Sequence, residues 1–83
     1  MFLKNALNGR SNLSGNIAQL TPRERQVLDL IGQGKTTKEI AALLQLSAGT
    51  VSNHRKAICK KLDIHSTAEL VCRAALHMLT AAI

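Results

Sequence analysis

The sequence predicts an all-α fold of four helices, two of them joined as a helix-turn-helix, and three observations support this prediction. At three places a threonine or serine precedes a glutamate by three positions, which is the capping-box pattern of helix starts. Apolar residues recur at helical spacing after each of these places. The 83 residues include one aromatic side chain, so the core must consist of aliphatic residues that suit closely packed helices.

Residues 1–19 differ in composition from the rest of the chain. After a short apolar patch they are rich in Asn, Gly and Ser, a composition that is typical of a linker. We therefore expect residues 1–19 to be a linker that follows a helical remnant of something larger. Residues 20–83 are expected to form the folded domain.

The first helix of this domain is expected to begin directly after Thr21. Thr21 and Glu24 form the first capping box, and Pro22 at the first helical position loses no hydrogen bond there. We expect Gly32 and Gly34 to end the helix, because glycine adopts the left-handed cap conformation without steric cost.

A short second helix is expected after Thr36, which pairs with Glu39 in the second capping box. Its apolar residues are Ile40, Ala41, Leu43 and Leu44. The helix is expected to end near Gln45, where a turn of a few residues leads into the next helix. Two helices joined by such a turn are the sequence form of a helix-turn-helix.

The third helix, about residues 48–62, carries the strongest functional signal. Ser47 is a preferred N-cap residue, and Val51, Ile58 and Leu62 form a narrow apolar stripe that can pack inward. The opposite side carries Ser52, Asn53, Lys56 and Lys60, and Arg55 and Lys61 flank the two stripes. No acidic residue lies between Ser47 and Leu62, so a polyanion is expected to complete this basic face.

The last helix, about residues 67–80, follows a third predicted capping box, Ser66 with Glu69. Its polar residues fall on one stripe, and most of the remaining circumference is apolar. We expect one apolar face to be buried in the core and another to form a dimer interface. The predicted interface residues are Val71, Ala75, Met78 and Leu79. The alternative is that alanine and a frayed end explain the apolar excess.

Other motifs are weighed and rejected. The run Gly32–Thr36 resembles a phosphate-binding loop, but the required glycine position holds Asp29 and no strand precedes it. The histidines and cysteines lack the paired spacing of structural zinc sites, so no metal or other cofactor is expected. The carboxylates form no catalytic pattern with a serine, so the chain is not expected to be an enzyme.

The net charge of +6 and the pI near 10.0 favour an acidic partner, although an excess of lysine in a small soluble domain is the alternative. The near absence of aromatic residues disfavours single-strand binding, which stacks bases on aromatic rings. No secretory signal and no apolar run of membrane-spanning length is present in the sequence. The two cysteines are expected to be reduced thiols in the cytoplasm.

Residues 20–72 strongly resemble the LuxR-type helix-turn-helix domain, also called the GerE or FixJ/NarL type. The resemblance is carried by the runs LTPRE from Leu20, KEIA from Lys38, SxxTVxxH from Ser47, and KL from Lys61. It implies a four-helix LuxR-type fold, with the third helix in the DNA major groove and dimerisation through the fourth. Residues 2–20 also resemble the end of a receiver domain and its linker, as in the response regulators of two-component systems.

The resemblance also implies which residues contact DNA. The positions that match base-contacting residues of the family are Ser52, Asn53 and Lys56. The positions that match phosphate contacts are Thr36, Lys38, Ser47, Thr50 and Lys60. Position 52 is often lysine in the family, and Ala48 and Gly49 replace a polar pair, so the preferred operator sequence is expected to differ.

The sequence therefore predicts a homodimeric regulator of transcription that binds double-stranded DNA in the bacterial cytoplasm, on the nucleoid. A different hypothesis is a protein-interaction module that holds another regulator through its last helix and scarcely binds DNA. A third is a promoter-binding module like that of a sigma factor, which would need RNA polymerase as a partner. A steep dependence of duplex binding on salt would distinguish the first from the second.

Overall fold

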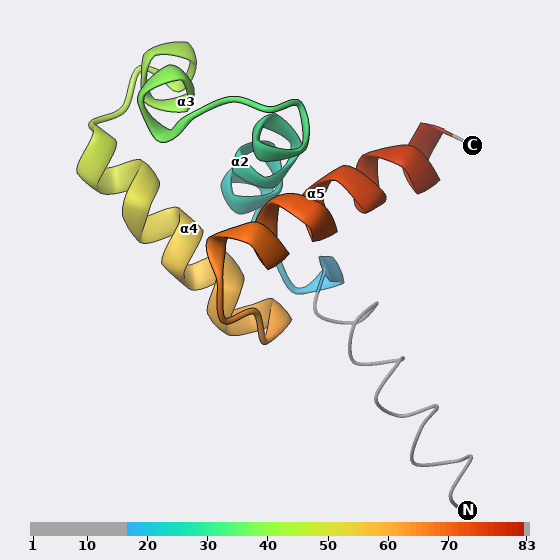
Figure 1. Cartoon of the computed structure of the whole chain (residues 1–83). Helices are drawn as coiled ribbons and strands as arrows, with labels where there is room; N and C mark the ends of the chain where they lie inside the picture. Colours follow the sequence, from blue (N-terminus) through green and yellow to red (C-terminus); the bar gives the residue numbers. More distant parts are fainter. Residues whose placement is uncertain (1–16, 83) are drawn as a thin grey trace, which may run out of the picture.

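The computed structural model describes residues 17–82, and four helices account for most of this part of the chain. They are α2 (Pro22–Gly32), α3 (Thr37–Leu44), α4 (Ala48–Leu62) and α5 (Thr67–Ala82), and these residues contain no strand. Figure 1 shows α3 and α4 joined by a tight turn, with α5 crossing in front of α2. α2 packs against each of the other three helices, so it is the centre of the domain. The predicted all-α, four-helix fold is confirmed.

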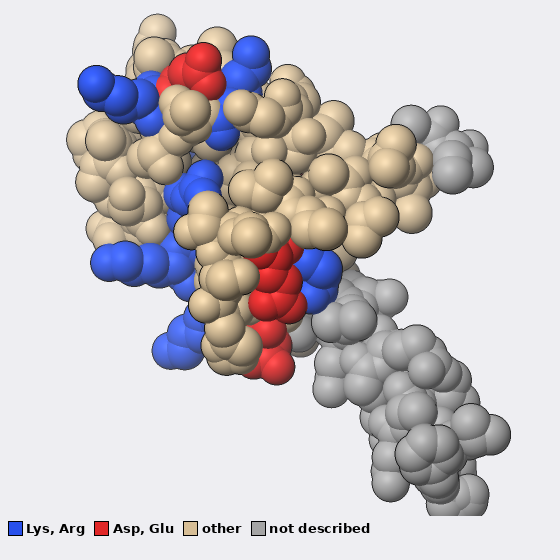
Figure 2. Space-filling model, in the orientation of Figure 1, with Lys and Arg blue, Asp and Glu red and all other residues tan. Residues whose placement is uncertain are grey.

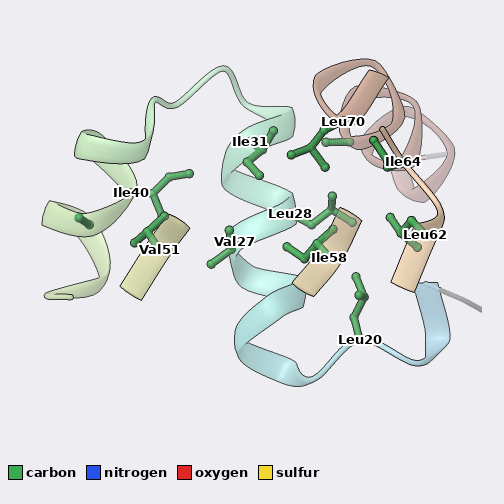
Figure 3. Packing of buried hydrophobic residues seen from close by; sticks show 12 residues of the cluster. Leu20, Val27, Leu28, Ile31, Ile40, Val51, Ile58, Leu62, Ile64 and Leu70 are labelled. Atoms are coloured by element: carbon green, nitrogen blue, oxygen red, sulfur yellow. The ribbon is translucent and has the colours of Figure 1, made fainter. Parts of the chain in front are cut away.

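The core is aliphatic and is built from the stripes that the helical spacing predicted. Val27, Leu28 and Ile31 of α2 are almost completely buried. Figure 3 shows them between the inward side chains of the other helices. Those side chains are Ile40 of α3, Val51, Ile58 and Leu62 of α4, and Leu70 of α5. This cluster contains only aliphatic side chains. Each contact between two of their atoms is weak, so the helices must approach closely to make many such contacts.

Local hydrogen bonds begin the helices where the sequence predicted. In the first capping box Thr21 Oγ1 accepts from the Glu24 N–H at 3.1 Å, and Glu24 Oε1 accepts from the Thr21 N–H at 2.9 Å. Thr36 and Glu39 repeat this arrangement at α3. The third capping box is only half correct. Ser66 Oγ accepts from the Glu69 N–H, but Glu69 Oε1 accepts from the N–H of His65, one residue earlier than a closed box requires.

The ends of α3 and α4 use a device that the sequence did not reveal. Gln45 and Asp63 both adopt left-handed backbone conformations, with φ of 58° and 57°. The next residue in each case donates its N–H back to the last turn, from Leu46 to Ala41 at 2.9 Å and from Ile64 to Cys59 at 2.8 Å. Both turns therefore satisfy free helix carbonyls and bring an apolar residue back to the core.

Gly32 has a different role from the predicted helix stop. It is the last residue of α2, and Gln33 follows as the cap. A Cβ atom at Gly32 would lie 2.7 Å from the carbonyl oxygen of Ala74 and 2.8 Å from Sδ of Met78, both on α5. Glycine is required here because α5 passes too close for any side chain. The turn itself uses Gly34, whose φ of 88° is in the left-handed region.

The burial of two side chains differs from what their polarity alone suggests. Leu43, which the sequence grouped with the apolar residues of α3, is 57% exposed. The polar stripe of α5 is not a solvent face throughout, because the His77 side chain is only 16% exposed and its ring nitrogen lies 3.8 Å from the Asp29 carboxylate on α2. Both differences arise because helical spacing does not say how wide the packed face will be.

The left-handed conformation of Gln45 leads to a prediction about stability. We expect Gln45→Gly to raise the free energy of unfolding by about 0.5–1 kcal/mol, because a non-glycine residue pays for this conformation and glycine does not. Urea denaturation followed by circular dichroism measures the change. Gln33→Gly is the matched control, since Gln33 also caps a helix but has a φ of −82°. An equal gain at both positions would show that the left-handed strain is not the cause.

Candidate nucleic-acid interface

The outward face of α4 is polar and basic. Asn53, Lys56 and Lys60 are exposed, and Ser52 is half-buried beside them. Val51, Ile58 and Leu62, on the opposite side of the helix, have no exposed surface. Burial of this stripe determines the rotation of α4 about its axis, and it therefore directs the predicted base-contacting residues to solvent.

The predicted phosphate contacts at the helix starts already make hydrogen bonds within the protein. Ser47 Oγ accepts from the N–H of Thr50 at 3.0 Å and donates to Thr50 Oγ1 at 2.9 Å. The Thr50 hydroxyl accepts that proton, so its own hydrogen remains available for a ligand. Thr36 likewise caps α3, and Lys38 is exposed one residue beyond the helix start.

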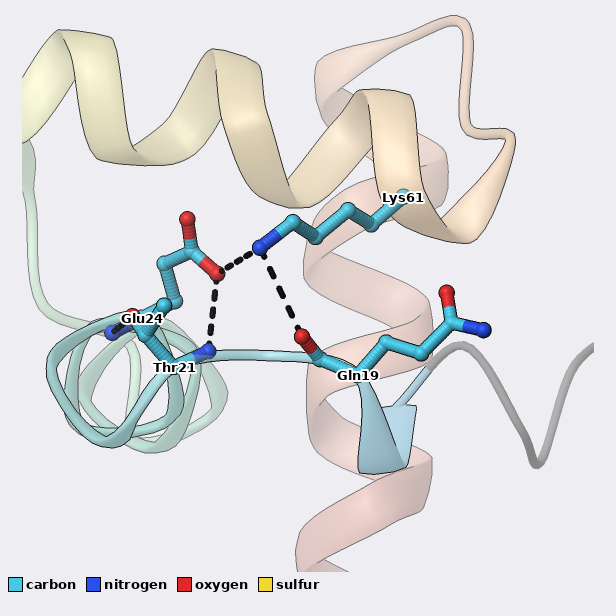
Figure 4. A network of polar contacts seen from close by, with 4 residues as sticks. All are labelled: Gln19, Thr21, Glu24 and Lys61. Atoms are coloured by element: carbon cyan, nitrogen blue, oxygen red, sulfur yellow. Dashed lines mark hydrogen bonds and ion pairs between the residues drawn. The ribbon is translucent and has the colours of Figure 1, made fainter.

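Lys61 does not belong to the basic face, although the sequence placed it as a flanking cation. Its Nζ lies 2.8 Å from Glu24 Oε1, and 3.5 Å from the carbonyl oxygen of Gln19. Figure 4 shows Lys61 Nζ and the Thr21 N–H meeting at the Glu24 carboxylate, with Lys61 Nζ also reaching the carbonyl oxygen of Gln19. The pair joins the start of α2 to the last turn of α4, so the cations of α4 left for a ligand are Arg55, Lys56 and Lys60.

Glu24 is the buried charged residue of this contact, with 6% of its surface exposed. Burial acts to raise the pKa of the carboxyl, but the hydrogen bonds from Lys61 and the Thr21 N–H, together with the positive charge of Lys61, outweigh it. The pKa of Glu24 therefore lies below its ordinary value of 4.5. The ionised carboxylate is thus the form that the fold stabilises.

Two basic hollows that the sequence did not predict adjoin α4. One lies between α4 and the start of α5, and its lining includes Ser52, Arg55, Lys56, Lys60 and Thr67. The other lies between α4, α5 and the segment before α3, and its lining includes Lys35, Thr36, Arg55 and Val71. Figure 2 shows basic side chains gathered over α3 and α4 on this side of the molecule. The sequence analysis named Arg55 only as a flanking cation and did not name Lys35, because neither lies on the outward stripe of a helix.

The predicted dimer residues divide into two groups. Val71 and Leu79 are 42% and 63% exposed, and Ala75 is half-buried. Met78 is half-buried, and its thioether lies beside Gly32 of α2, so part of its surface is already occupied within the chain. Leu76, outside the predicted set, is 54% exposed. The exposed apolar surface of α5 is therefore broader than the predicted interface.

The described part of the chain contains two free thiols and no cluster of metal-binding side chains. Within residues 17–82, no group of three or more His, Cys, Asp or Glu residues could hold a metal ion. Cys59 is half-buried and Cys72 is exposed, and both are free thiols. Burial raises the pKa of the Cys59 thiol, which makes it a poor nucleophile. None of the described helices is long and apolar enough to cross a membrane.

Comparison with known families identifies the domain. Residues 18–74 match the GerE family, described as bacterial regulatory proteins of the luxR family. The chain belongs to the LuxR family. The match covers α2, α3, α4 and the first half of α5, which are the elements that carry the basic face and its supporting core. Membership in this family of regulatory proteins agrees with the expectation that the chain is not an enzyme.

Three relatives illustrate the similarity of this LuxR-family chain to response regulators. It is 58% identical over 60 residues to the uncharacterized response regulatory protein YgeK of Escherichia coli (strain K12). It is 44% identical over 55 residues to the transcriptional regulatory protein DesR of Bacillus subtilis (strain 168). It is 42% identical over 60 residues to the nitrate/nitrite response regulator protein NarL of E. coli (strain K12).

These alignments cover most of this chain but a minor part of each relative. They cover 72%, 66% and 72% of the chain, but only 40%, 28% and 28% of YgeK, DesR and NarL. The predicted resemblance to the family is therefore confirmed for the helical domain.

Residues 1–16 lie outside the described part of the structure. Ile17 packs against the core and Gln19 contacts Lys61, so the chain is already held by the domain at these residues. The predicted boundary at residue 19 stays a prediction.

The Glu24–Lys61 pair predicts an acid-sensitive contribution to stability. Because the folded pKa of Glu24 lies below the unfolded value, its contribution is complete above about pH 4.5 and is lost as the pH falls through the folded pKa. At neutral pH we expect Glu24→Gln to lower the free energy of unfolding by roughly 1–2 kcal/mol, the range of charged hydrogen bonds reduced for the partial exposure of Lys61.

Denaturant titrations measure the difference in free energy of unfolding between wild type and Glu24→Gln. They are carried out between about pH 3 and pH 7, because a carboxylate titrates in roughly this interval. The gap between wild type and Glu24→Gln should narrow as the solution is acidified. Glu39→Gln is the comparison, since Glu39 has the same capping role in α3 and a pKa that is also lowered, chiefly by the Thr36 N–H. No ion pair within residues 17–82 includes Glu39, so its gap should be smaller than that of Glu24→Gln at neutral pH. A gap that stays constant down to the lowest pH would contradict a role for the charge of Glu24.

Proposed function

We propose that this chain is a sequence-specific, double-stranded DNA-binding regulator of transcription, with α4 in the major groove. The observation that supports it most directly is the exposed, acid-free face of α4, rotated outward by the burial of Val51, Ile58 and Leu62. Family membership supports the same role, as does similarity to the transcriptional regulatory protein DesR and the response regulator NarL. The protein would act in the bacterial cytoplasm on nucleoid DNA.

Base reading is assigned to the exposed stripe of α4. Asn53 can pair with the N6 and N7 positions of adenine, and Lys56 can donate to O6 or N7 of guanine. Ser52 has a shorter reach, and its half-buried position limits it to a base edge that approaches closely. This stripe is narrow, so one domain reads a short sequence and a second domain is needed for a full operator.

Phosphate binding is assigned to the residues around the helix starts and to Lys60. The Thr50 hydroxyl, the backbone N–H groups at the start of α4 and Lys38 can contact phosphate oxygens beside the groove. Ser47 and Thr36 contribute chiefly by holding these helix starts in place, since their hydroxyls accept backbone hydrogen bonds. Such contacts determine register on the duplex and carry no sequence information directly.

A homodimer formed through α5 would present two such domains to two half-sites. The exposed apolar residues Val71 and Leu79 support this assignment, because they lie on one side of α5 and are not covered by the described part of the chain. A two-fold dimer places its half-sites about one helical turn apart. RNA polymerase is a further proposed partner at a promoter, for which the exposed Leu43 on α3 is a candidate contact.

Lys56 and Lys60 should have distinct roles. Lys56→Ala should weaken binding to the selected operator by about 1–3 kcal/mol and relax discrimination at one base, while binding to random DNA changes little. Lys60→Ala should weaken binding to all duplexes and reduce the salt slope by about 1, as expected for a lost phosphate contact. Fluorescence anisotropy on selected and random duplexes over a range of salt measures both. Identical behaviour of the two variants would count against base reading by Lys56.

The dimer is tested by placing a carboxylate in the apolar face. Leu79→Glu should abolish self-association in sedimentation experiments and weaken binding to a two-half-site operator more than to a single half-site. Leu76→Glu is the matched control, because it makes the same change on the same helix outside the predicted set. An equal effect of both variants would show that the interface includes Leu76 and is not limited to the predicted residues. Wild-type protein that stays monomeric at high concentration and on DNA would remove the dimer altogether.

A further inference from the structure

Arg55 has an unusual position among the cations of α4. Lys56 and Lys60 are exposed on the outward face, whereas Arg55 is half-buried on the side of α4 that faces α5. It lines both of the hollows described above, so the two hollows meet at this side chain. No ion pair within residues 17–82 includes Arg55. A guanidinium at the junction of two open hollows is placed to contact an external anion.

The two hollows share Arg55, and each combines apolar side chains, such as Leu70 and Val71, with polar and basic groups. The polar lining of the hollow before α3 includes Arg55, Lys35 and Thr36. The polar lining of the hollow at the start of α5 includes Arg55, Lys60 and Thr67, the first residue of α5. No Asp or Glu lines either hollow. Hydroxyl, guanidinium and ammonium groups in a row are the donors that contact successive phosphate oxygens.

Nearby carboxylates define the limits of this surface. At one end the hydrogen bond from the Thr36 N–H is the largest cause that lowers the pKa of Glu39, and the positive charge of Lys35 lowers it further. At the other end Asp63 lies 3.0 Å from the His65 ring, and the Glu69 carboxylate accepts from the His65 N–H. The negative charge gathers around His65, so the basic surface ends at Thr67.

We propose that this surface, the Arg55 flank (Lys35, Thr36, Arg55, Lys60 and Thr67), binds the phosphates of one DNA strand while α4 reads the bases. The inference rests on the proposed DNA-binding function and adds Lys35, Arg55 and Thr67 to its contacts. Its geometric basis is that Lys60 belongs both to the outward face of α4 and to this flank. A duplex seated on the outward face therefore brings one backbone along the side where Arg55 lies.

Arg55 is tested by removing its charge. Arg55→Gln should weaken binding to selected and random duplexes by the same factor, and it should make the slope of log K against log[salt] shallower by about 0.9. Arg55→Lys keeps the charge and should keep the slope, which separates lost charge from lost packing. Arg25→Gln, the same change at an exposed residue of α2, should leave the slope unchanged. Thermal melting of each variant checks that it is folded.

Thr67 gives an independent test that does not depend on removing a packed side chain. Thr67→Glu places a carboxylate in the first turn of α5, where the helix dipole favours it, so the fold should tolerate the change. The same carboxylate would face the DNA backbone, and binding to every duplex should weaken. Gln26→Glu on the exposed side of α2 adds the same charge elsewhere and should have little effect.

The outcomes separate this inference from the function on which it rests. Wild-type protein that binds duplexes with a steep salt slope, together with unaltered slopes in Arg55→Gln and unaltered affinity in Thr67→Glu, would overturn the Arg55 flank and leave the proposed function standing. Wild-type protein that shows no salt-dependent duplex binding would overturn the proposed function itself.

Discussion

The domain depends on the packing of α4 against α2. The buried stripe of Val51, Ile58 and Leu62 meets Val27 and Leu28 of α2, and this contact fixes both the position and the rotation of α4. A helix rotated by even a third of a turn would bury a lysine and expose an isoleucine, which is costly on both counts. The same apolar contact that holds the fold together therefore presents the basic face to solvent.

The charge distribution follows from how few acids the chain has. With 11 basic and 5 acidic residues, the sequence has fewer than half as many carboxylates as cations. Where an acid does meet a lysine, at Glu24 and Lys61, the contact is structural and joins the start of α2 to the end of α4. Arg55, Lys56 and Lys60 are not part of this contact. The Glu24 carboxylate therefore neutralises Lys61 and leaves the charge of the basic face unchanged.

Much of this architecture could be predicted from local sequence patterns. The capping boxes at Thr21 and Thr36 and the apolar stripe of α4 each depend on residues a few positions apart, and the structure has them as predicted. The missed features depend on distant residues or on backbone conformation. Lys61 meets a carboxylate 37 positions away, and Arg55 is set apart by the helices around it. The left-handed Gln45 carries no glycine signal, so its role as a cap could not be read from the sequence.

The close approach at Gly32 has a consequence for assembly. The absence of a side chain there lets the Ala74–Met78 segment of α5 rest directly on the end of α2. A methyl group at that point would push α5 away from α2, because it would meet the Ala74 carbonyl oxygen and the Met78 side chain. In a dimer joined through α5, that displacement would change the angle between the α4 helices of the two domains. In the proposed dimer, glycine at position 32 would therefore help to set the angle at which the two domains meet a duplex.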